Sequence, residues 1–275
     1  MFSSRSRILV LLVAAVVSAC GGDKSPATAP PQPDPHPTVL LEDIVIPQLP
    51  SPYYHFAYDA TGRMTNASFA SDFTMYTLSY VDGRLSEMQN NILVNHDRLV
   101  YYYDAAGNVA QVDYVGSAGV FTQVRFTYDG AKLIGLERQR KNASGFVVDK
   151  TMTMAYGADG NLSELTEHRP AIEGFQPEAT VTDHFENYDA GINVDSFGLL
   201  HQDFFDHLVL LPRVQLQKSN PRRITHSGDG DHYVVEYTYQ YDNQNRPLSK
   251  AGVLTFTSGT QTGRQFEVSA MYSYY

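Results

Sequence analysis

Two short stretches of the sequence bring together side chains of the types that bind metal ions. The first contains His201, Asp203, Asp206 and His207. Asp203 and His207 stand at positions i and i+4, so on a helix they would lie one turn apart and could share a zinc ion. A zinc site needs three or four convergent ligands, however, and this stretch shows only the one pair. A solvated polar face of a helix explains the same residues, and we favour that interpretation.

The second stretch is HSGDGDH, residues 226–232, in which Asp229 and Asp231 flank a glycine. Such a sequence can present oxygens to calcium, but the other ligand positions of a calcium loop are missing. Asp-Gly is also a common turn of a β-hairpin, and we favour the turn. We therefore predict no metal and no cofactor, and the weak metal candidates are His201, Asp203, His207, Asp229 and Asp231.

The sequence contains no motif of a known catalytic machinery. A Gly-x-Ser-x-Gly elbow, a P-loop, a His-Glu-x-x-His motif and a dinucleotide fingerprint are all absent. Many acidic residues stand in predicted turns, and nothing indicates the carboxylate pair of a glycosidase. We predict that the protein is not an enzyme. The alternative of an envelope hydrolase would need carboxylates or histidines to converge around residues 183–207, a stretch that begins with Asp183, His184 and Glu186.

The elements that would position these side chains repeat along the chain. Six units end a strand-like run at or near a tyrosine, continue with Asp, Gly or Asn, and usually resume with an aliphatic residue. They are HFAYDATGRM (55–64), LSYVDGRL (78–85), VYYYDAAGNV (100–109), RFTYDGAKL (125–133), MAYGADGNL (154–162) and YQYDNQNRPL (239–248). Their tyrosines are Tyr58, Tyr80, Tyr103, Tyr128, Tyr156 and Tyr241. The first five are 22, 23, 25 and 28 residues apart, which is the spacing of one hairpin.

Each unit has the composition of a β-hairpin. Residues 124–128 alternate Val, Phe and Tyr with Arg and Thr, which places one set on each face of a strand. Asp followed by Gly supplies the cap and the positive φ of a tight turn, and Asn245 replaces the glycine because asparagine tolerates the left-handed region. Hairpins that join neighbours in sequence predict an antiparallel meander.

Tyrosines stand at alternate positions in several units, most clearly in VVEYTYQYDNQNRPLSK (234–250). Such rows of tyrosines have three interpretations. Inside a sheet, each ring would be buried and its hydroxyl would reach the end of the sheet. As an outward sugar-binding platform, the candidates are Tyr101, Tyr102, Tyr237 and Tyr239. As a membrane girdle, the rings would need strands of about 9–11 residues, longer than the predicted ones. We favour the sheet interior.

Residues 168–223 break the hairpin rhythm. Four apolar residues recur there at three- to four-residue spacing before Pro212, namely Leu200, Phe204, Leu208 and Leu211. We predict one amphipathic helix over about 196–211, which packs on the sheet or closes the end of a barrel.

The amino terminus has the pattern of a secretory signal. Arg5 and Arg7 precede an apolar run over residues 8–17, which is too short to span a bilayer. The sequence VSAC that follows resembles a bacterial lipobox. This resemblance implies that residues 1–19 are removed and that Cys20, the only cysteine, carries a diacylglycerol and an amino-terminal acyl chain such as palmitate. Two or three such chains form a stable anchor.

The chain after the cysteine divides into a tether and one domain. Residues 20–40 are the lipidated cysteine with a Pro-rich tether, and residues 41–275 are the β domain. The formal charge of −10 and the pI near 5.3 argue against a nucleic-acid partner.

The turns DATGRM and DAAGNV resemble YD repeats, the tyrosine–aspartate hairpins of Rhs-type proteins and of bacterial lipoproteins of unknown function. The resemblance covers residues 50–166 and 232–275. From the hairpin units we predict an all-β antiparallel meander of roughly ten to fourteen strands, which curls into an open or closed barrel-like sheet. The resemblance implies the curved, barrel-like form of this sheet. It brings no catalytic residues.

These observations predict a lipid-anchored envelope protein. By resemblance to lipoproteins that are sorted between two membranes, the neutral Gly21 after the cysteine implies the outer membrane of a Gram-negative bacterium. The predicted role is a non-enzymatic binding or structural module whose partner is an envelope glycan, a peptide or another envelope protein. An outer-membrane barrel or pore and an envelope hydrolase are the alternatives.

Overall fold

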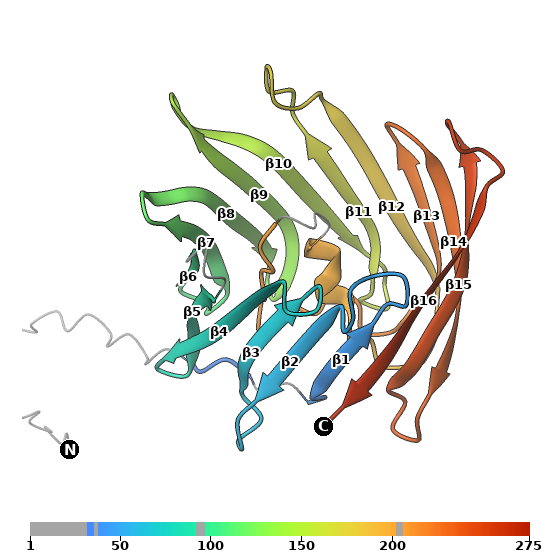
Figure 1. Cartoon of the computed structure of the whole chain (residues 1–275), viewed down its shortest axis with the longest axis horizontal. Coiled ribbons are helices and arrows are strands. Elements are labelled where there is room, and N and C mark those ends of the chain that lie inside the picture. The colour runs from blue at the N-terminus through green and yellow to red at the C-terminus, as the bar shows by residue number, and fades with distance from the viewer. Residues whose placement is uncertain (1–31, 36–37, 92–96, 202–205) are drawn as a thin grey trace, which may run out of the picture. The chain divides into compact units, whose positions relative to one another are not determined.

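Sixteen strands in the described part of the chain form one antiparallel sheet that closes on itself as a barrel (Figure 1). This computed structural model describes residues 32–35, 38–91, 97–201 and 206–275. The strands are β1 (Leu41–Val45), β2 (Tyr54–Tyr58), β3 (Met64–Phe69), β4 (Thr74–Val81), β5 (Arg84–Asn90), β6 (Arg98–Tyr103), β7 (Val109–Gly116), β8 (Gly119–Asp129), β9 (Lys132–Asn142), β10 (Gly145–Tyr156), β11 (Leu162–Arg169), β12 (Ala179–Tyr188), β13 (Pro221–Gly228), β14 (His232–Tyr241), β15 (Pro247–Ser258) and β16 (Gln265–Tyr274).

The sheet is a pure meander, because each strand pairs with the next one along the chain. The first and last strands close the ring, with Leu41 opposite Tyr274 and Ile44 opposite Tyr272. The predicted fold class is therefore confirmed, although the barrel has more strands than the ten to fourteen expected. One of the additional strands, β12, lies inside the stretch that breaks the hairpin rhythm.

The predicted helix over 196–211 is wrong. Within the described residues it shrinks to one 3-10 turn, η1 (Ser196–Leu200), and residues 206–220 contain no helix or strand. Leu208, Val209, Leu210 and Leu211 are all buried in succession. An amphipathic helix needs a wet face, whereas this segment has apolar surroundings on more than one side, so the three- to four-residue spacing did not report a helix.

Side chains alternate between the inside and the outside of the barrel. Along β8, Val124 and Phe126 are buried in the apolar core, while Arg125 and Thr127 between them are exposed. Strand β4 shows the same period of two, and bulges interrupt it in other strands. The apolar core lies inside the ring.

Tyrosines from all eight even-numbered strands bond the neighbouring strand near one rim of the barrel. Each hydroxyl donates to the carbonyl of the first or second residue of the preceding strand. The pairs are Tyr58–Leu41, Tyr80–Met64, Tyr103–Leu85, Tyr128–Val109, Tyr156–Leu133, Tyr188–Leu162, Tyr239–Pro221 and Tyr274–Pro247, with O···O distances of 2.5–3.0 Å. We call this rim the tyrosine rim. The structure thus confirms, for these residues, that the tyrosine rows line the sheet interior.

Aspartates cap the turns at the same rim. The Asp59 carboxylate accepts from the backbone N–H groups of Thr61 and Arg63, and Asp242 accepts from those of Gln244 and Arg246. Asn245 adopts φ +60°, as its replacement of glycine predicts.

Candidate functional site

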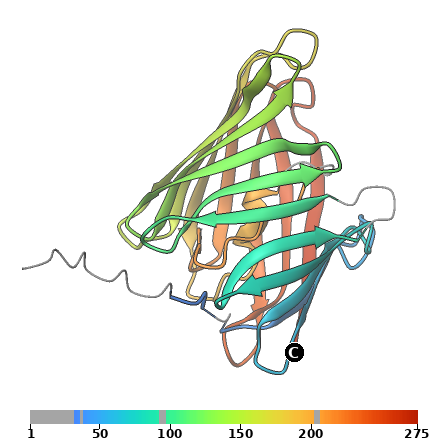
Figure 2. The ribbon, with the colours of Figure 1, turned by 90° about the vertical axis from the view of Figure 1, so that its left-hand side faces the viewer.

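The described residues between β12 and β13, which are 189–201 and 206–220, lie inside the barrel (Figures 1 and 2). We call these residues the inner segment. Leu208 and Leu216 are almost completely buried against the inner wall. The N–H of Leu162 in β11 donates a hydrogen bond to the Leu216 carbonyl at 3.0 Å. The interior of the barrel is therefore filled in part by the chain itself.

The two histidines predicted as weak metal ligands instead hold this segment to the wall. His201 Nδ1 lies 2.9 Å from the hydroxyl of Tyr54 in β2, and His207 Nδ1 lies 2.6 Å from the hydroxyl of Tyr76 in β4. Burial lowers the pKa of His207 below its usual value, against the attraction of the Asp97 and Asp206 carboxylates. Within the described ranges, no three His, Cys, Asp or Glu side chains converge as a metal site.

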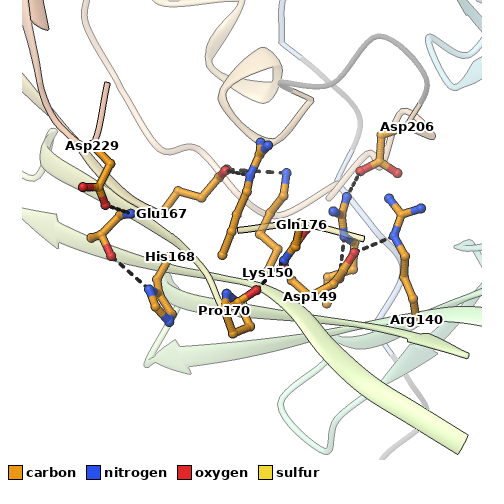
Figure 3. Close-up of polar contacts among 12 residues, drawn as sticks. Arg140, Asp149, Lys150, Glu167, His168, Pro170, Gln176, Asp206 and Asp229 are labelled. Atoms are coloured by element: carbon orange, nitrogen blue, oxygen red, sulfur yellow. Dashed lines mark hydrogen bonds and ion pairs between the residues drawn. The ribbon is translucent and has the colours of Figure 1, made fainter. Parts of the chain in front are cut away.

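Charged side chains occupy the inner face of β9 and β10 (Figure 3). Arg138 is almost buried and donates from Nε to Asp149 at 2.9 Å, and it also pairs with Asp206 of the inner segment. Arg140 donates to the second oxygen of Asp149 at 2.5 Å. Burial opposes the charge of Arg138, but the two carboxylates outweigh it and raise the pKa of the guanidinium. These contacts fix the inner segment to the opposite wall.

The same polar face continues into β11. Glu167 lies 3.4 Å from the ammonium of Lys150 and 2.5 Å from Nε of Arg169, and both Glu167 and Lys150 are almost fully buried. The interior on this side therefore carries two ion-pair clusters. Arg138 and Arg140 pair with Asp149 and Asp206, and Lys150 and Arg169 pair with Glu167. We call the two clusters together the inner charge network.

A second ion pair holds the start of the inner segment to β15 and β16. Asp195 accepts from the ammonium of Lys250 and from the hydroxyl of Tyr272, both at 2.6 Å. Burial opposes the charge of each partner, but the pairing prevails, so the pKa of Asp195 is lowered and that of Lys250 is raised.

The outer face of the barrel carries charged pairs as well as exposed apolar side chains such as Met75 and Met271. Six ion pairs join neighbouring strands there, at positions that alternate with core residues: His55–Asp43, Arg98–Glu87, Arg125–Glu137, His184–Glu164, Arg223–Glu186 and Arg223–Glu236. Their N···O distances run from 2.7 to 3.9 Å. The barrel thus turns its apolar core cluster inward and these six charged pairs outward.

A cavity of about 440 Å³ lies at the tyrosine rim, between β1–β5 and the inner segment. Apolar side chains from both sides line it, among them Phe56, Leu78 and Leu85 from the strands and Phe197 and Leu210 from the inner segment. Its polar lining includes Tyr58, Tyr80, Arg63, Asp34 and Arg213. This volume lies in the range of small-molecule sites, ~300–1,000 Å³.

The end of the predicted tether is fixed beside this cavity. The Asp34 carboxylate accepts from the N–H of Leu85 and from the hydroxyl of Tyr103, both at 2.8 Å, and Arg213 lies 3.5 Å away. A Cβ on Gly83 would lie only 2.6 Å from Cβ of Pro33, so this turn needs glycine for Pro33 to dock. Residues 32–35 therefore pack on the barrel.

The predicted aromatic ligand-binding candidates lie on different faces. Tyr101 is buried and accepts a hydrogen bond from the Leu210 N–H at 3.3 Å, whereas Tyr102 points outward and is 48% exposed. Tyr237 and Tyr239 are half-buried on the inner face, with ring centroids 6.1 Å apart. The four side chains do not form one platform.

The remaining candidates serve local structure. Asp229 accepts from the N–H of Thr180 at 2.7 Å, and Asp231 accepts from the N–H and hydroxyl of Thr260, so the turn interpretation of HSGDGDH fits. Asp183 contacts His226 at 2.6 Å inside the barrel, while the next residue, His184, points outward to Glu164. Asp183 and His184, with which the stretch named for the hydrolase alternative begins, therefore point to opposite faces of the sheet. Asp203 and Cys20 lie outside the described residues.

Sequence reasoning missed the inner charge network and Arg63. The sequence did contain a signal for the network. Arg138, Lys150 and Glu167 stand at inward-facing positions of their strands, where most other residues are apolar. Arg63 carried no such signal, since it belongs to a regular turn.

No protein-family model matches the sequence, and no curated protein matches it. Solved structures do match. A porin-like protein from Bacteroides uniformis is 14% identical with a TM-score of 0.54, over 81% of this chain and 89% of that one. A porin-like protein from Bacteroides vulgatus is 12% identical with a TM-score of 0.51, over 80% of this chain and 92% of that one. At these identities the likeness concerns the fold, an antiparallel barrel. No helix in the described residues is long and apolar enough to cross a membrane.

Proposed function

We propose that this protein is a cell-envelope barrel that works in water, anchored through a lipid on Cys20, and that its interior binds an amphipathic ligand without catalysis. The observation that carries the proposal is the direction of the side chains. Barrels that span a bilayer present an apolar band of about 25 Å to lipid and a polar interior. On this barrel the cross-strand ion pairs lie on the outer face, and the interior holds an apolar core cluster beside the inner charged side chains.

The free-energy cost of placing the charged outer face in lipid supports a barrel that works in water. Each Arg or Lys on the lipid face of a barrel costs about 2–4 kcal/mol at the bilayer midplane. Arg125 lies near the middle of β8, and Arg223 in β13 pairs with two glutamates across two strand boundaries. Placing this outer face in hydrocarbon would also desolvate the partner carboxylates, so water is the favoured surrounding.

A second candidate is an outer-membrane barrel. The likeness to porin-like proteins favours it in fold and fits this alternative better than a lipoprotein module. Strand length also permits it in part, because β8 and β9 have 11 residues and β10 and β15 have 12, longer than the sequence suggested. The outward ion pairs oppose it.

Purification without detergent separates these two candidates. Residues 21–275 contain the whole compact unit Gln32–Tyr275, so this chain retains every described contact. We expect a monodisperse protein in detergent-free buffer that produces no conductance when added to a planar bilayer. A protein that needs detergent and opens channels would establish the outer-membrane barrel instead.

The lipid anchor has its own test. The full chain, expressed in a Gram-negative cell, should sediment with membranes, and its amino-terminal peptide should carry the mass of a diacylglycerol and an acyl chain on Cys20. The Cys20→Ala chain is the matched control and should lose both properties. Recovery of an unmodified peptide beginning at another residue would contradict the anchor. The resemblance to YD-repeat lipoproteins remains a prediction.

A further inference from the structure

The cavity at the tyrosine rim has the lining of a site for a hydrocarbon chain. One wall comes from the barrel and includes Phe56, Leu78 and Leu85, and the other comes from the inner segment and includes Phe197 and Leu210. Sugars need a larger share of hydrogen-bonding groups than such walls provide, whereas methylene groups gain free energy when they leave water for them. The cavity therefore favours an apolar ligand or the apolar part of an amphipathic one.

The two arginines of this cavity differ in their charge balance. Arg213 lies 3.5 Å from Asp34 and donates to two backbone carbonyls of residues 32–33, so its charge is matched within the protein. Arg63 is half-buried and places its guanidinium 5.0 Å from the centroid of the Tyr80 ring. The described residues provide it with no carboxylate within ion-pair distance, and the nearby Asp59 accepts from the backbone of its own turn. Arg63 is thus a cation available to an anion at the cavity.

The position of the tether connects this cavity with a membrane. Asp34, Pro35, Thr38 and Val39 line the cavity, and the clamp around Asp34 fixes the chain at this rim. Fourteen residue steps separate Cys20 from Asp34. A fully extended chain spans at most about 50 Å over fourteen steps, at about 3.6 Å per residue. A chain anchored at Cys20 therefore keeps this rim, with its cavity, within that distance of the lipid surface.

We propose that the cavity binds one acyl chain of a single-chain amphiphile with an anionic head group, and that Arg63 binds the head group. The proposal rests on the proposed function, because it takes the barrel to work in water beside the membrane that holds its anchor. A carboxylate or a phosphate meets the same requirement at Arg63, so a free fatty acid and a lysophospholipid are two sources of one ligand chemistry.

Binding can be measured on lipid-free residues 21–275 by displacement of a fluorescent acyl probe. Palmitate, 1-palmitoyl-lysophosphatidylglycerol and uncharged hexadecanol serve as competitors, each below its aggregation limit. We expect one equivalent of the anionic amphiphile per chain. Displacement by palmitate but not the lysolipid would identify a fatty acid, the reverse would identify a phospholipid head group, and both results support the proposal.

Three variants test the assignment of residues. Arg63→Gln should weaken binding of the anionic ligand about tenfold, the loss of one charge-assisted contact, and leave hexadecanol unaffected. Val214→Trp places a large ring among the lining residues and should prevent binding of all three competitors. Arg125→Gln, which removes an arginine from the outer face, is the matched control and should bind as the unmodified chain does.

The results that overturn the proposal are distinct from those that overturn the proposed function. A monodisperse, detergent-free protein that binds none of the competitors would refute the acyl-chain site and leave the water-exposed barrel intact. Equal binding of palmitate by Arg63→Gln and the unmodified chain would refute the role of Arg63. A protein that is insoluble without detergent would instead refute the proposed function itself.

Discussion

The inner charge network allows a sharp prediction about stability. Asp149 is completely buried and accepts hydrogen bonds from both Arg138 and Arg140. Asp149→Asn keeps the shape of the side chain but removes the negative charge. Removing one partner of a buried ion pair costs about 3–5 kcal/mol, because the other charge stays desolvated. Arg138 retains Asp206, so we expect the lower end of this range, about 3 kcal/mol.

Reversible urea unfolding at pH 7 measures this loss as a change in the free energy of unfolding. The matched control is Glu137→Gln, which removes a carboxylate from the outer face of β9, where Arg125 lies 3.9 Å away and both side chains are well exposed. Such a surface pair contributes about 0–1 kcal/mol.

Two outcomes would contradict the reasoning. If Asp149→Asn and Glu137→Gln lose the same free energy, the network does not carry the buried charge that its geometry implies. A combined Arg138→Met, Asp149→Leu and Asp206→Leu variant should regain most of the loss, because apolar replacement of a whole buried charge cluster is often neutral. Failure to regain it would show that the single variant disturbs packing and not charge.

Three further predictions concern protonation and turn geometry. His207 has a lowered pKa in the folded protein, so the histidine binds a proton more readily in the unfolded chain. The free energy of unfolding should therefore fall as the pH drops below 6.5. In urea unfolding, His207→Gln should make that decline less steep. Burial raises the pKa of Tyr156 to about 12 in the folded protein. The stability that the neutral Tyr156 side chain contributes is therefore complete below pH 10 and is lost as the pH rises toward 12. Tyr156→Phe should reduce this loss of stability between pH 10 and 12. It should also cost about 1 kcal/mol at pH 7, because the Leu133 carbonyl loses its donor. An unchanged loss at high pH would show that Tyr156 ionises freely. Asn245 has φ +60°, a conformation that valine adopts only with backbone strain. Asn245→Val should therefore lower the unfolding midpoint by the equivalent of about 1–2 kcal/mol, and Asn245→Gly should not. Equal midpoints for the two variants would refute this backbone strain.

The hairpins were predictable because their determinants are local. The Asp59 cap, the left-handed Asn245 and the alternation of residues 124–128 each depend on a few neighbouring residues. A meander follows when such hairpins succeed one another. The burial of the rim tyrosines was also predictable, since a ring at the end of a strand can bury its face and still hydrogen-bond at the edge.

The inner segment was not predictable in the same way. Its apolar residues recur as in a helix, but the segment packs inside a ring of strands, where consecutive residues such as Leu210 and Leu211 are buried together. Likewise, nothing local indicated that His201 and His207 would bond Tyr54 and Tyr76, which precede them by 147 and 131 residues.

The sequence by itself determined the hairpin units, the antiparallel order and the positions that alternate along each strand, because these depend on local turn chemistry and a period of two. The tertiary structure decided the closure of sixteen strands, the side that faces inward and the cavity between the strands and the inner segment. A period of two separates two faces but does not say which one becomes concave. That choice arises only when β1 meets β16 and the inner segment occupies the space they enclose.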